Sequence, residues 1–258
     1  MKDYGLVSII TPSYNSADFI VETIEGILKQ TYTNWELIIT DDCSTDNSVT
    51  IIKDYLSKDK RIKLILLNTN SGAGVCRNKS IELAKGRYIA FCDSDDVWMP
   101  HKLEKQLQFL EAKDCALVYS SYMLMNEYSQ VKGIVVCNSK ITYTAMKRDD
   151  GIGCLTAMYD THKLGKIYMP TIRKRQDWAL WLDILSRCKI SYGLKEPLAY
   201  YRIRQNSISK KKITLVKYNL NVYRTVLKYS LPKAYLFFFF IFLPTYFLKK
   251  LKEKWNSL

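Results

Sequence analysis

The side chains best suited to chemistry lie in CDSDDVW, residues 92–98, where Asp93, Asp95 and Asp96 place three carboxylates within four positions. Carboxylates this close repel one another unless a cation or a hydrogen-bonding ligand lies among their oxygens. Such clusters bind hard divalent cations, Mg²⁺ or Mn²⁺, and a bound cation stabilises the charge that develops on a leaving diphosphate. The alternative is a solvated acidic turn that caps a helix near Lys102–Leu110.

The elements that must position these carboxylates alternate between strand and helix. Apolar runs predict strands at 6–10, 35–40, 62–67 and 87–92, and helical spacing predicts helices at 16–32, 44–58 and 72–86. This alternation with short connections predicts a parallel α/β sheet. Ligands bind such sheets outside the carboxyl ends of the strands. Because three of the four strands end in polar sequence (TPSYN, TDDCS and CDSDD), a ligand site is predicted at that edge.

Helix ends are predicted from capping residues. Ser16 or Asp18 is expected near the start of the first helix, and Ser44 or Thr45 at the start of the second. Gly86 is expected to stop the third helix. The alternation loosens after this point, and the segments expected there are a helix near 102–113, a strand at 115–125 and mixed elements to about 205.

Composition indicates a folded protein with reduced thiols. The chain of 258 residues is 48% apolar and holds 19 tyrosines, which suits one large domain or one domain with a tail. Its seven cysteines are scattered without a CxxC pair, so a disulfide framework or a zinc site is not expected. The first ten residues lack the long apolar stretch of a signal peptide. A cytoplasmic protein is therefore expected.

The chain resembles the family 2 glycosyltransferases in four segments that occur in the family's order and spacing. These segments are VSIITPSYN, ELIITDDCSTDNS, NSGAGVCRNKSIELAKGRYIAFCDSDD and RQDWALW, and the resemblance covers about residues 5–205. CDSDDVW corresponds to the DxD signature of the family. The resemblance implies a GT-A fold with a mostly parallel sheet, a nucleotide-sugar donor, a divalent cation (Mn²⁺ or Mg²⁺) and transfer with inversion, of the hexosyltransferase type.

The resemblance also implies which residues bind the nucleotide base. Pro12 and Tyr14 match residues that flank the base, and Asp42, with Asp41 beside it, matches the carboxylate that reads a ring N–H. A carboxylate accepts hydrogen bonds without donating any, which suits the N3–H of uracil or thymine. A UDP-sugar is therefore favoured, although guanine also presents donors and the base stays open. The alternative roles are packing over the sheet edge for Tyr14 and a helix cap near Ser44 for Asp42.

Further matches concern the diphosphate and the metal. Arg77 matches a basic residue near the base or diphosphate, with a surface helix position as its alternative. Asp95 matches the carboxylate at the ribose hydroxyls and shares the metal with Asp96, the direct ligand. Asp93 opens the signature and is expected to support the donor sugar or the loop.

Asp177 in RQDWALW matches the general base that deprotonates the acceptor hydroxyl. The family commonly has Glu before this Asp, whereas this chain has Gln176. The alternative is an Asp that is favoured by the helix dipole. Trp178, Trp181 and Leu182 are expected to bury one face of the helix and fix the carboxylate.

A later loop, YYRIRQNSISKKK, resembles a family loop patterned Tyr-Arg-x-His-x-x-Ser. Arg204 stands where His is usual, and an Arg can pair with phosphate oxygens but cannot ligate a metal. Arg202 or Arg204 is therefore expected at the diphosphate, with a solvated basic loop as the alternative. His101 and His162 are interpreted as ordinary residues and not as ligands.

The net charge of +14 is concentrated near the C-terminal end. Residues 208–258 hold eleven Lys or Arg and one acid, Glu253, so ten of the fourteen net charges lie there. The nearly balanced remainder gives no support for a nucleic-acid-binding body, and the tail aromatics are not interleaved with cations as nucleic-acid binding would favour. The tail therefore calls for a different partner.

That partner is predicted from Ala234–Leu248, an uncharged and mostly apolar run between Lys233 and Lys249–Lys250. As a helix it would span about 22 Å at roughly 1.5 Å per residue, less than the bilayer core of about 30 Å. Partial burial in an anionic membrane surface is favoured, with a buried helix or a dimer contact as the alternative. A membrane-docked enzyme would suit a lipid-linked sugar acceptor at the inner face of the cell membrane.

The domain prediction is a GT-A domain at 1–207, with a nucleotide-binding half at about 1–100 and an acceptor-binding half at about 101–207, followed by a tail at 208–258. The leading interpretation is an inverting glycosyltransferase of bacterial surface-polysaccharide synthesis. The alternatives are a sugar nucleotidyltransferase, whose Gly-rich basic loop is missing from TPSYNSADF, and an inactive sugar-nucleotide-binding protein. The sequence predicts neither the donor sugar, the acceptor linkage nor the oligomeric state.

Overall fold

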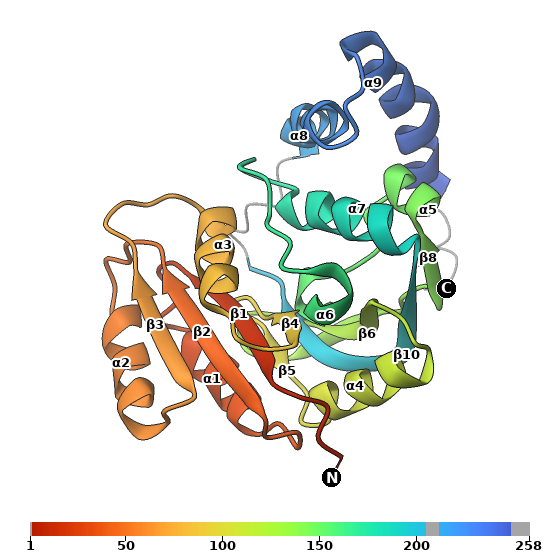
Figure 1. Ribbon diagram of the computed structural model, residues 1–258. Helices are drawn as coiled ribbons and strands as arrows, with labels where there is room; N and C mark the ends of the chain where they lie inside the picture. The colour runs from red at the N-terminus through yellow and green to blue at the C-terminus, as the bar shows by residue number, and fades with distance from the viewer. Residues whose placement is uncertain (1, 205–211, 249–258) are drawn as a thin grey trace.

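The computed structural model describes residues 2–204 and 212–248 of the chain (Figure 1). Within these residues the strands join into one sheet in the order β3-β2-β1-β4-β9-β6-β10-β5, with β7 paired to β6 and β8 paired to β10. The strands are β1 (Val7–Ser13), β2 (Trp35–Asp41), β3 (Ile62–Leu66), β4 (Tyr88–Phe91), β5 (Val97–Trp98), β6 (Leu117–Met125), β7 (Val131–Val135), β8 (Lys140–Thr142), β9 (Met158–Asp160) and β10 (Ile190–Arg202).

The predicted parallel sheet is confirmed in the N-terminal half, where β3, β2, β1 and β4 all run in one direction. The residues of β1, β2 and β4 are all buried, which explains why these three strands read as continuous apolar runs and not as alternating ones. β6 and β10 add a second parallel pair. The short strands β5, β7, β8 and β9 pair antiparallel to their neighbours, so the C-terminal half of the sheet is mixed.

Helices cover both faces of the sheet. The helices are α1 (Ile20–Leu28), α2 (Ser48–Lys58), α3 (Ala73–Leu83), α4 (Lys102–Ala112), α5 (Tyr143–Arg148), α6 (Thr161–Leu164), α7 (Gln176–Cys188), α8 (Lys212–Thr225) and α9 (Leu231–Phe237), with a 3₁₀ turn η1 (Cys154–Thr156) and a π-helical segment η3 (Phe238–Phe242). One apolar core joins α1, α2 and α4 to residues such as Ile9 and Leu37. The other joins α3, α5 and α7 to residues such as Ile10 and Ile38 on the opposite face.

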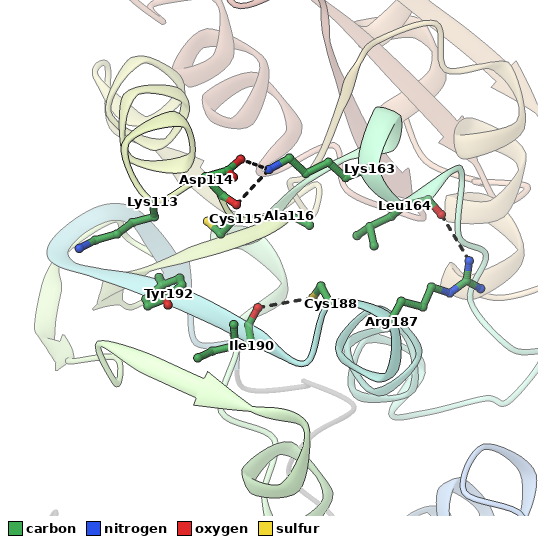
Figure 2. Close-up of a pocket in the computed structure, with 10 residues that line it drawn as sticks. All are labelled: Lys113, Asp114, Cys115, Ala116, Lys163, Leu164, Arg187, Cys188, Ile190 and Tyr192. Carbon is green, nitrogen blue, oxygen red and sulfur yellow. Dashed lines mark hydrogen bonds and ion pairs between the residues drawn. The ribbon is translucent and has the colours of Figure 1, made fainter.

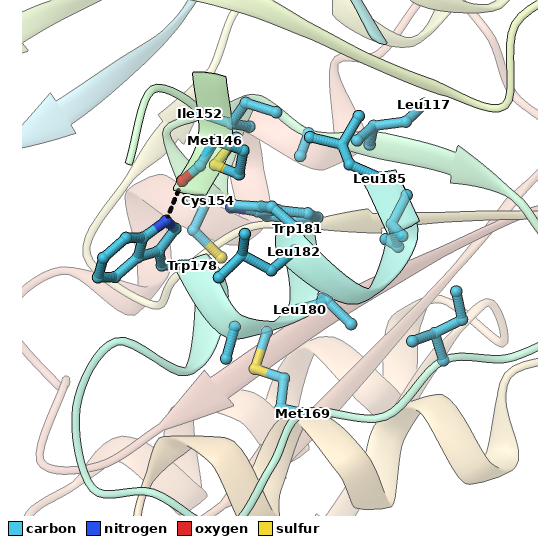
Figure 3. Close-up of a cluster of buried hydrophobic side chains, with 14 of the residues drawn as sticks. Leu117, Met146, Ile152, Cys154, Met169, Trp178, Leu180, Trp181, Leu182 and Leu185 are labelled. Atoms are coloured by element: carbon cyan, nitrogen blue, oxygen red, sulfur yellow. Dashed lines mark hydrogen bonds between the residues drawn. The ribbon is translucent and has the colours of Figure 1, made fainter. Parts of the chain in front are cut away.

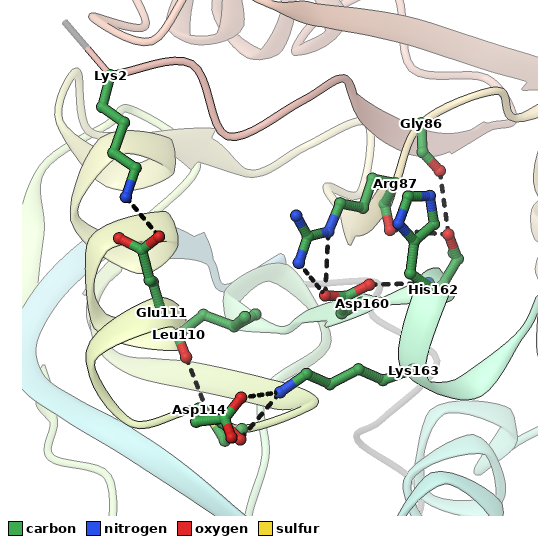
Figure 4. A network of polar contacts seen from close by, with 11 residues as sticks. Lys2, Gly86, Arg87, Leu110, Glu111, Asp114, Asp160, His162 and Lys163 are labelled. Atoms are coloured by element: carbon green, nitrogen blue, oxygen red, sulfur yellow. Dashed lines mark hydrogen bonds and ion pairs between the residues drawn. The ribbon is translucent and has the colours of Figure 1, made fainter.

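The two halves of the sheet are joined at the edge where β4 begins. The Asp160 carboxylate, at the end of β9, is fully buried and accepts hydrogen bonds from the Arg87 guanidinium at 2.9 and 3.2 Å (Figure 4). Lys2 and Glu111 form a second ion pair at 2.5 Å, near the start of the chain. The Arg87–Asp160 pair lies at the amino end of β4, opposite the end at which β4 leads into the acidic turn.

The predicted helix caps differ from those observed. α1 begins at Ile20, and it is the Ser16 carbonyl, not its side chain, that accepts the first amide hydrogen bonds. α2 begins at Ser48, whose amide bonds to the Asp46 carboxylate, so the Ser44 and Thr45 caps were wrong. α3 ends at Leu83. The expected capping residues therefore located these helix ends only to within a few positions. Ser44 and Thr45 bond to the neighbouring loop residues Asn15 and Asp41 instead of capping α2.

The tail begins beyond the undescribed residues 205–211, so the predicted boundary at 207 lies outside the described part of the chain. α8 and α9 follow, and the helix continues through η3 to Leu248. This confirms a C-terminal apolar helix. Figure 1 shows α8 and α9 above α7, on the side of the sheet where β1 and β2 end.

Candidate active site

The three predicted ligand loops lie at one edge of the sheet, which we call the carboxyl edge (residues 12–15, 41–44 and 92–96). Parallel pairing places Ser13 opposite Asp41 and Ile10 opposite Phe91, so the loops after β1, β2 and β4 leave the sheet together. The loops after β1 and β2 are also tied to each other. The Asn15 amide donates to Ser44 Oγ at 2.9 Å, and the Asn15 side chain accepts from the Thr45 amide at 2.9 Å.

Asp41 and Asp42 both lie at this edge and are both buried, but they bond to different loops. Asp41 accepts from the Ser44 amide at 2.8 Å and from the Ser44 hydroxyl at 2.6 Å. Asp42 accepts from the backbone amides of Ser71 at 2.7 Å and Gly72 at 2.8 Å. Gly72 has a φ of 89° and directly precedes α3. Asp42 therefore fixes the start of α3, not that of α2, while its role in reading a base stays a prediction.

Pro12 and Tyr14 lie on the first loop in opposite environments. Pro12 is buried at the end of β1, whereas the Tyr14 ring is 49% exposed. A ring this exposed beside the carboxyl edge has room to stack on a planar ligand. The predicted role of Tyr14 at the base is untested, and its packing alternative is less consistent with this exposure.

Arg77 joins the acidic turn to the start of α7. Its guanidinium donates to the Asp93 carboxylate at 2.5 Å and to Gln176 Oε1 at 3.4 Å. The side chain is almost fully buried, which opposes its charge, but the negative charges of Asp93 and Asp177 hold the pKa of Arg77 above its ordinary value. The surface-helix alternative for Arg77 is wrong. The Arg77 charge therefore interacts both with Asp93 of the acidic turn and with Asp177, the predicted base.

Gln176 is a site residue whose role the sequence left undetermined. Its Nε2 donates to the Ile172 carbonyl at 2.6 Å while its Oε1 accepts from Arg77 at 3.4 Å, a pair of bonds that an amide can make and a glutamate carboxylate cannot. Gly74 packs directly against it, since a Cβ at that position would lie 2.8 Å from the Gln176 amide. A neutral residue at 176 thus satisfies Arg77 without adding a fourth charge beside Asp93 and Asp177.

The carboxylates of Asp95 and Asp96 are crowded and largely desolvated. Asp96 is 1% exposed, and burial, with Asp95 and Asp93 adding to it, raises its pKa well above the usual value. Burial and Asp93 also raise the pKa of Asp95. Within residues 2–204 and 212–248, no three His, Cys, Asp or Glu side chains converge as a metal site. The turn nevertheless fits a divalent cation that is held by one or two carboxylates and by substrate phosphates, because a cation there would relieve the repulsion.

Arg202 is fully buried and hydrogen-bonds to two residues of the acidic turn, Asp95 and Asp96. Its backbone amide donates to Asp96 Oδ1 at 3.0 Å. Its guanidinium donates to five oxygens: the Asp95 carbonyl at 2.8 Å, the Asn126 and Glu127 carbonyls at 3.3 Å each, Ser129 Oγ at 2.9 Å and the Glu22 carboxylate at 2.8 Å. With its donors occupied, Arg202 is placed as a positioning residue for the acidic turn, and its geometry gives no support for the expected diphosphate contact.

Arg204 has the opposite character. Its side chain is 34% exposed and contacts the Asp95 carboxylate at 3.5 Å. Both guanidinium groups lie over the Phe19 ring, at 4.9 Å for Arg202 and 4.8 Å for Arg204. Of the two arginines expected at the diphosphate, Arg204 is therefore the one that is accessible at the acidic turn.

Asp177 occupies the first turn of α7, partly exposed, with its carboxylate accepting from the Trp178 amide at 2.9 Å. The expectation that Trp178, Trp181 and Leu182 bury one face is confirmed, since all three are fully buried (Figure 3). Trp178 Nε1 also donates to the Met146 carbonyl of α5 at 2.7 Å. The helix that carries Asp177 is therefore rigidly held.

A pocket of about 390 Å³ lies elsewhere, at the C-terminal end of α7 (Figure 2). Its cations already bond within the protein: Lys163 donates to the Asp114 carbonyl at 3.0 Å and pairs with the Asp114 carboxylate, and Arg187 donates to the Leu164 carbonyl at 3.3 Å. These cations satisfy helix-end carbonyls. None of the predicted site residues lines this pocket, so it is not the candidate site.

A mostly parallel sheet, with an acidic turn after β4 and a helix that carries an aspartate and is linked to that turn through Arg77, is typical of the GT-A class of sugar transferases. A family model described as Glycosyl transferase family 2 matches residues 8–159. The chain belongs to this family and is a glycosyltransferase. Metal dependence and the donor are separate questions.

The relatives identify the process more narrowly. The chain is 44% identical over 230 residues (89% of this chain, 91% of the relative) to TuaG of Bacillus subtilis, which carries a provisional assignment as a teichuronic acid biosynthesis glycosyltransferase. It is 39% identical over 236 residues (91% of each) to WfgD of Escherichia coli, a UDP-Glc:alpha-D-GlcNAc-diphosphoundecaprenol beta-1,3-glucosyltransferase. The protein is therefore a glycosyltransferase of surface-polysaccharide synthesis.

Solved structures show the same fold. S. aureus TarS 1–349 in complex with UDP-GlcNAc matches with a TM-score of 0.71 at 23% identity, over 85% of this chain and 65% of TarS. The mannosyltransferase PcManGT from Pyrobaculum calidifontis, in complex with GDP-Man and Mn²⁺, matches with a TM-score of 0.65 at 15% identity, over 88% of this chain and 65% of PcManGT. This chain thus spans about two thirds of each of these structures, and the predicted GT-A fold is confirmed.

Proposed function

We propose that the protein is an inverting glycosyltransferase that transfers a hexose from a UDP-sugar to a hydroxyl of a lipid-linked glycan. The observation that carries this proposal is Arg77, which bonds to Asp93 of the acidic turn and to Gln176, the residue before Asp177. Arg77 thereby connects the acidic turn, proposed to bind the donor, to α7, which carries the proposed base Asp177. The lipid-linked acceptor is supported by the name of WfgD, and the UDP-sugar by WfgD and by the UDP-GlcNAc complex of TarS.

Each part of the donor has candidate residues. Pro12, Tyr14, Asp41 and Asp42 are proposed at the base. Arg77, Asp93 and Asp95 are proposed between the ribose and the diphosphate, and Arg204 at the diphosphate. Arg202 acts through Asp95 and Asp96 by holding their turn.

Transfer needs one base and one leaving group. Asp177 accepts the proton of the acceptor hydroxyl as that oxygen attacks the anomeric carbon from the face opposite the diphosphate. The new C–O bond forms while the bond from the anomeric carbon to the diphosphate oxygen breaks, and UDP departs with that electron pair. When bound at Asp96 and Asp95, Mn²⁺ or Mg²⁺ supplies positive charge for the departing diphosphate.

The proposed location is the cytoplasmic side of the membrane, with the protein bound peripherally at its surface. Among the described residues, the helix Leu231–Leu248 is long and apolar enough to cross a bilayer, by length and composition. Together with a lipid-linked acceptor, such a helix supports an enzyme that works at a membrane surface.

Calorimetric titration of the full chain with UDP, GDP and dTDP, with and without Mn²⁺, tests the proposal. We expect the wild type to bind UDP when Mn²⁺ is present, and Asp96→Asn to lose this metal-dependent binding. Asp54→Asn, on the exposed surface of α2, is the matched control and should bind UDP like the wild type. If Asp96→Asn bound UDP in the presence of Mn²⁺ as tightly as the wild type does, Asp96 would not be the metal ligand. Absence of binding by all three nucleotides to folded protein would reject the donor assignment.

A further inference from the structure

The tail helix 231–248 packs on the helix of the catalytic base through one face only. Ala234, Phe238 and Phe242 are buried, and they recur every four residues along this face. Phe242 lies against Trp178 of α7 with ring centroids 6.0 Å apart, and Phe238 stacks on Phe242 at 5.4 Å. The helix is therefore part of the folded body, and its inner face contacts the residue next to Asp177.

α8 supports the same arrangement. The Tyr223 ring packs edge-on against Trp178 at 5.6 Å and against Phe237 of the tail helix at 5.1 Å. Tyr223 and Val222 are fully buried. α7, α8 and the tail helix thus share one aromatic cluster, so the tail helix is packed on the helix that carries Asp177.

The opposite face of the tail helix is exposed and apolar. We call it the outer face, and its residues are Tyr235, Leu236, Phe239, Phe240, Phe247 and Leu248, all between 44% and 71% exposed. Soluble monomers rarely expose clustered apolar side chains of this kind without a partner. The outer face therefore has an occupant in the working protein.

Charge identifies the occupant. Exposed cations lie on the tail helix and on the α8 segment that packs against it: Lys217 and Arg224 on α8, Lys228 after it, and Lys233 on the tail helix. The sequence has no acid between Glu196 and Glu253. Two copies of such a surface would repel each other, whereas an anionic bilayer offers both apolar chains and negative headgroups. An exposed aromatic face on a segment with exposed cations and no acids fits the interface of that bilayer.

We propose that the outer face lies in the plane of an anionic bilayer surface while the inner face stays on α7, so that the docked enzyme presents its carboxyl edge to the membrane. In Figure 1, α8 and α9 lie on the side of the sheet where β1 and β2 end, which is the side of Asp41 and Asp42. The proposal rests on the proposed function in one respect, that the acceptor is lipid-linked. It gives a physical route by which such an acceptor meets Asp177.

Vesicle sedimentation of the full chain tests this docking. Wild type should bind phosphatidylcholine vesicles that contain phosphatidylglycerol and should bind pure phosphatidylcholine far less, with the difference falling at high salt. The variant F239E/F240E should lose at least tenfold in binding. The control L56E/L83E adds the same charge at exposed leucines of α2 and α3, and should bind like wild type.

Three results would overturn the proposal. Equal vesicle binding by F239E/F240E would remove the outer face from docking. A wild-type dimer in solution that F239E/F240E converts to a monomer would assign the face to a second copy. Resistance of the membrane-bound protein to alkaline carbonate extraction would indicate a spanning helix. UDP titration of the same samples separates these from failure of the proposed function, because F239E/F240E should bind UDP like wild type.

Discussion

The carboxyl edge and the outer face of the tail treat their side chains in opposite ways. At the carboxyl edge, nearly every polar group is paired inside the protein: Asp42 with backbone amides, Asp93 with Arg77, and Asp96 with the Arg202 amide. On the outer face, aromatic groups such as Phe240 have no contact partner that buries them and point to solvent. One region is organised before its ligand arrives, and the other is completed by its partner.

The difference fits the size and chemistry of the two proposed partners, a nucleotide-sugar and a bilayer. A nucleotide-sugar is small and charged, so positioned donors and acceptors recognise it with little reorganisation. A bilayer is large and fluid and offers no fixed hydrogen-bonding pattern, so exposed apolar area and surrounding cations are sufficient. The cations follow the same division, because Lys217, Arg224, Lys228 and Lys233 of the tail are exposed. In the body, by contrast, Arg77, Lys102 and Arg202 are buried.

The largest effect is expected from Asp177→Asn. Loss of the general base should lower turnover by about 10²–10⁴-fold and leave UDP binding within twofold. Initial rates with a lipid-linked acceptor, alongside UDP titration, give both values. Asp183→Asn is the control, on the same helix and paired with the exposed Arg187. Unchanged turnover in Asp177→Asn would refute the base assignment and confine the carboxyl edge to donor binding.

The variants Arg202→Met and Arg204→Met compare a buried arginine that is paired inside the protein with an accessible one. Removal of the fully buried Arg202 guanidinium leaves three backbone carbonyls without this donor and breaks the ion pair with Glu22, so the free energy of unfolding should fall by about 3 kcal/mol. Removal of Arg204 should change it by less than about 0.5 kcal/mol and lower UDP affinity about tenfold. Urea unfolding and calorimetry measure the two quantities. The assignment of the two arginines would be reversed if Arg202→Met kept full stability but lost UDP binding.

A pH-dependent effect is expected from Lys102, a buried residue at the start of α4. Its Nζ donates to Gln106 Oε1 at 2.5 Å and lies 3.9 Å from the Trp98 ring centroid. Burial lowers the pKa of Lys102 from 10.5 to about 7. Between pH 7 and 10 the unfolded chain therefore holds a proton that the folded chain lacks, so this residue adds stability as the pH rises.

Lys102→Met removes this contribution. The stability of wild type relative to Lys102→Met should increase from pH 7 to pH 10, by at most about 1.4 kcal/mol per pH unit. Urea unfolding at pH 7, 8.5 and 10 measures the difference. Lys105→Met, an exposed position on the same helix that pairs with Glu196, should show a much weaker trend. A constant difference between wild type and Lys102→Met would show that Lys102 stays charged in the folded protein.

Much of the fold and the candidate site was predictable because it depends on local pattern. Buried parallel strands produce apolar runs, and polar loops must follow at their carboxyl ends, so β1, β2 and β4 and their loops were located within a few residues. The burial of Trp178 and Trp181 followed from helical spacing. The helix caps were wrong because Ser44 and Thr45 bond across to Asp41 and Asn15, and such contacts depend on the neighbouring loop.

The residues of the chain determine which groups are present: three carboxylates after a strand, an aspartate at the start of an amphipathic helix, and an aromatic run between lysines. Only the tertiary structure separates Arg202, which is buried, from Arg204, which is accessible, although they stand two positions apart with the same chemistry. It also divides the tail into a face packed on Trp178 and a free one. Side-chain type is local, whereas burial and partners are set by segments far apart in the chain.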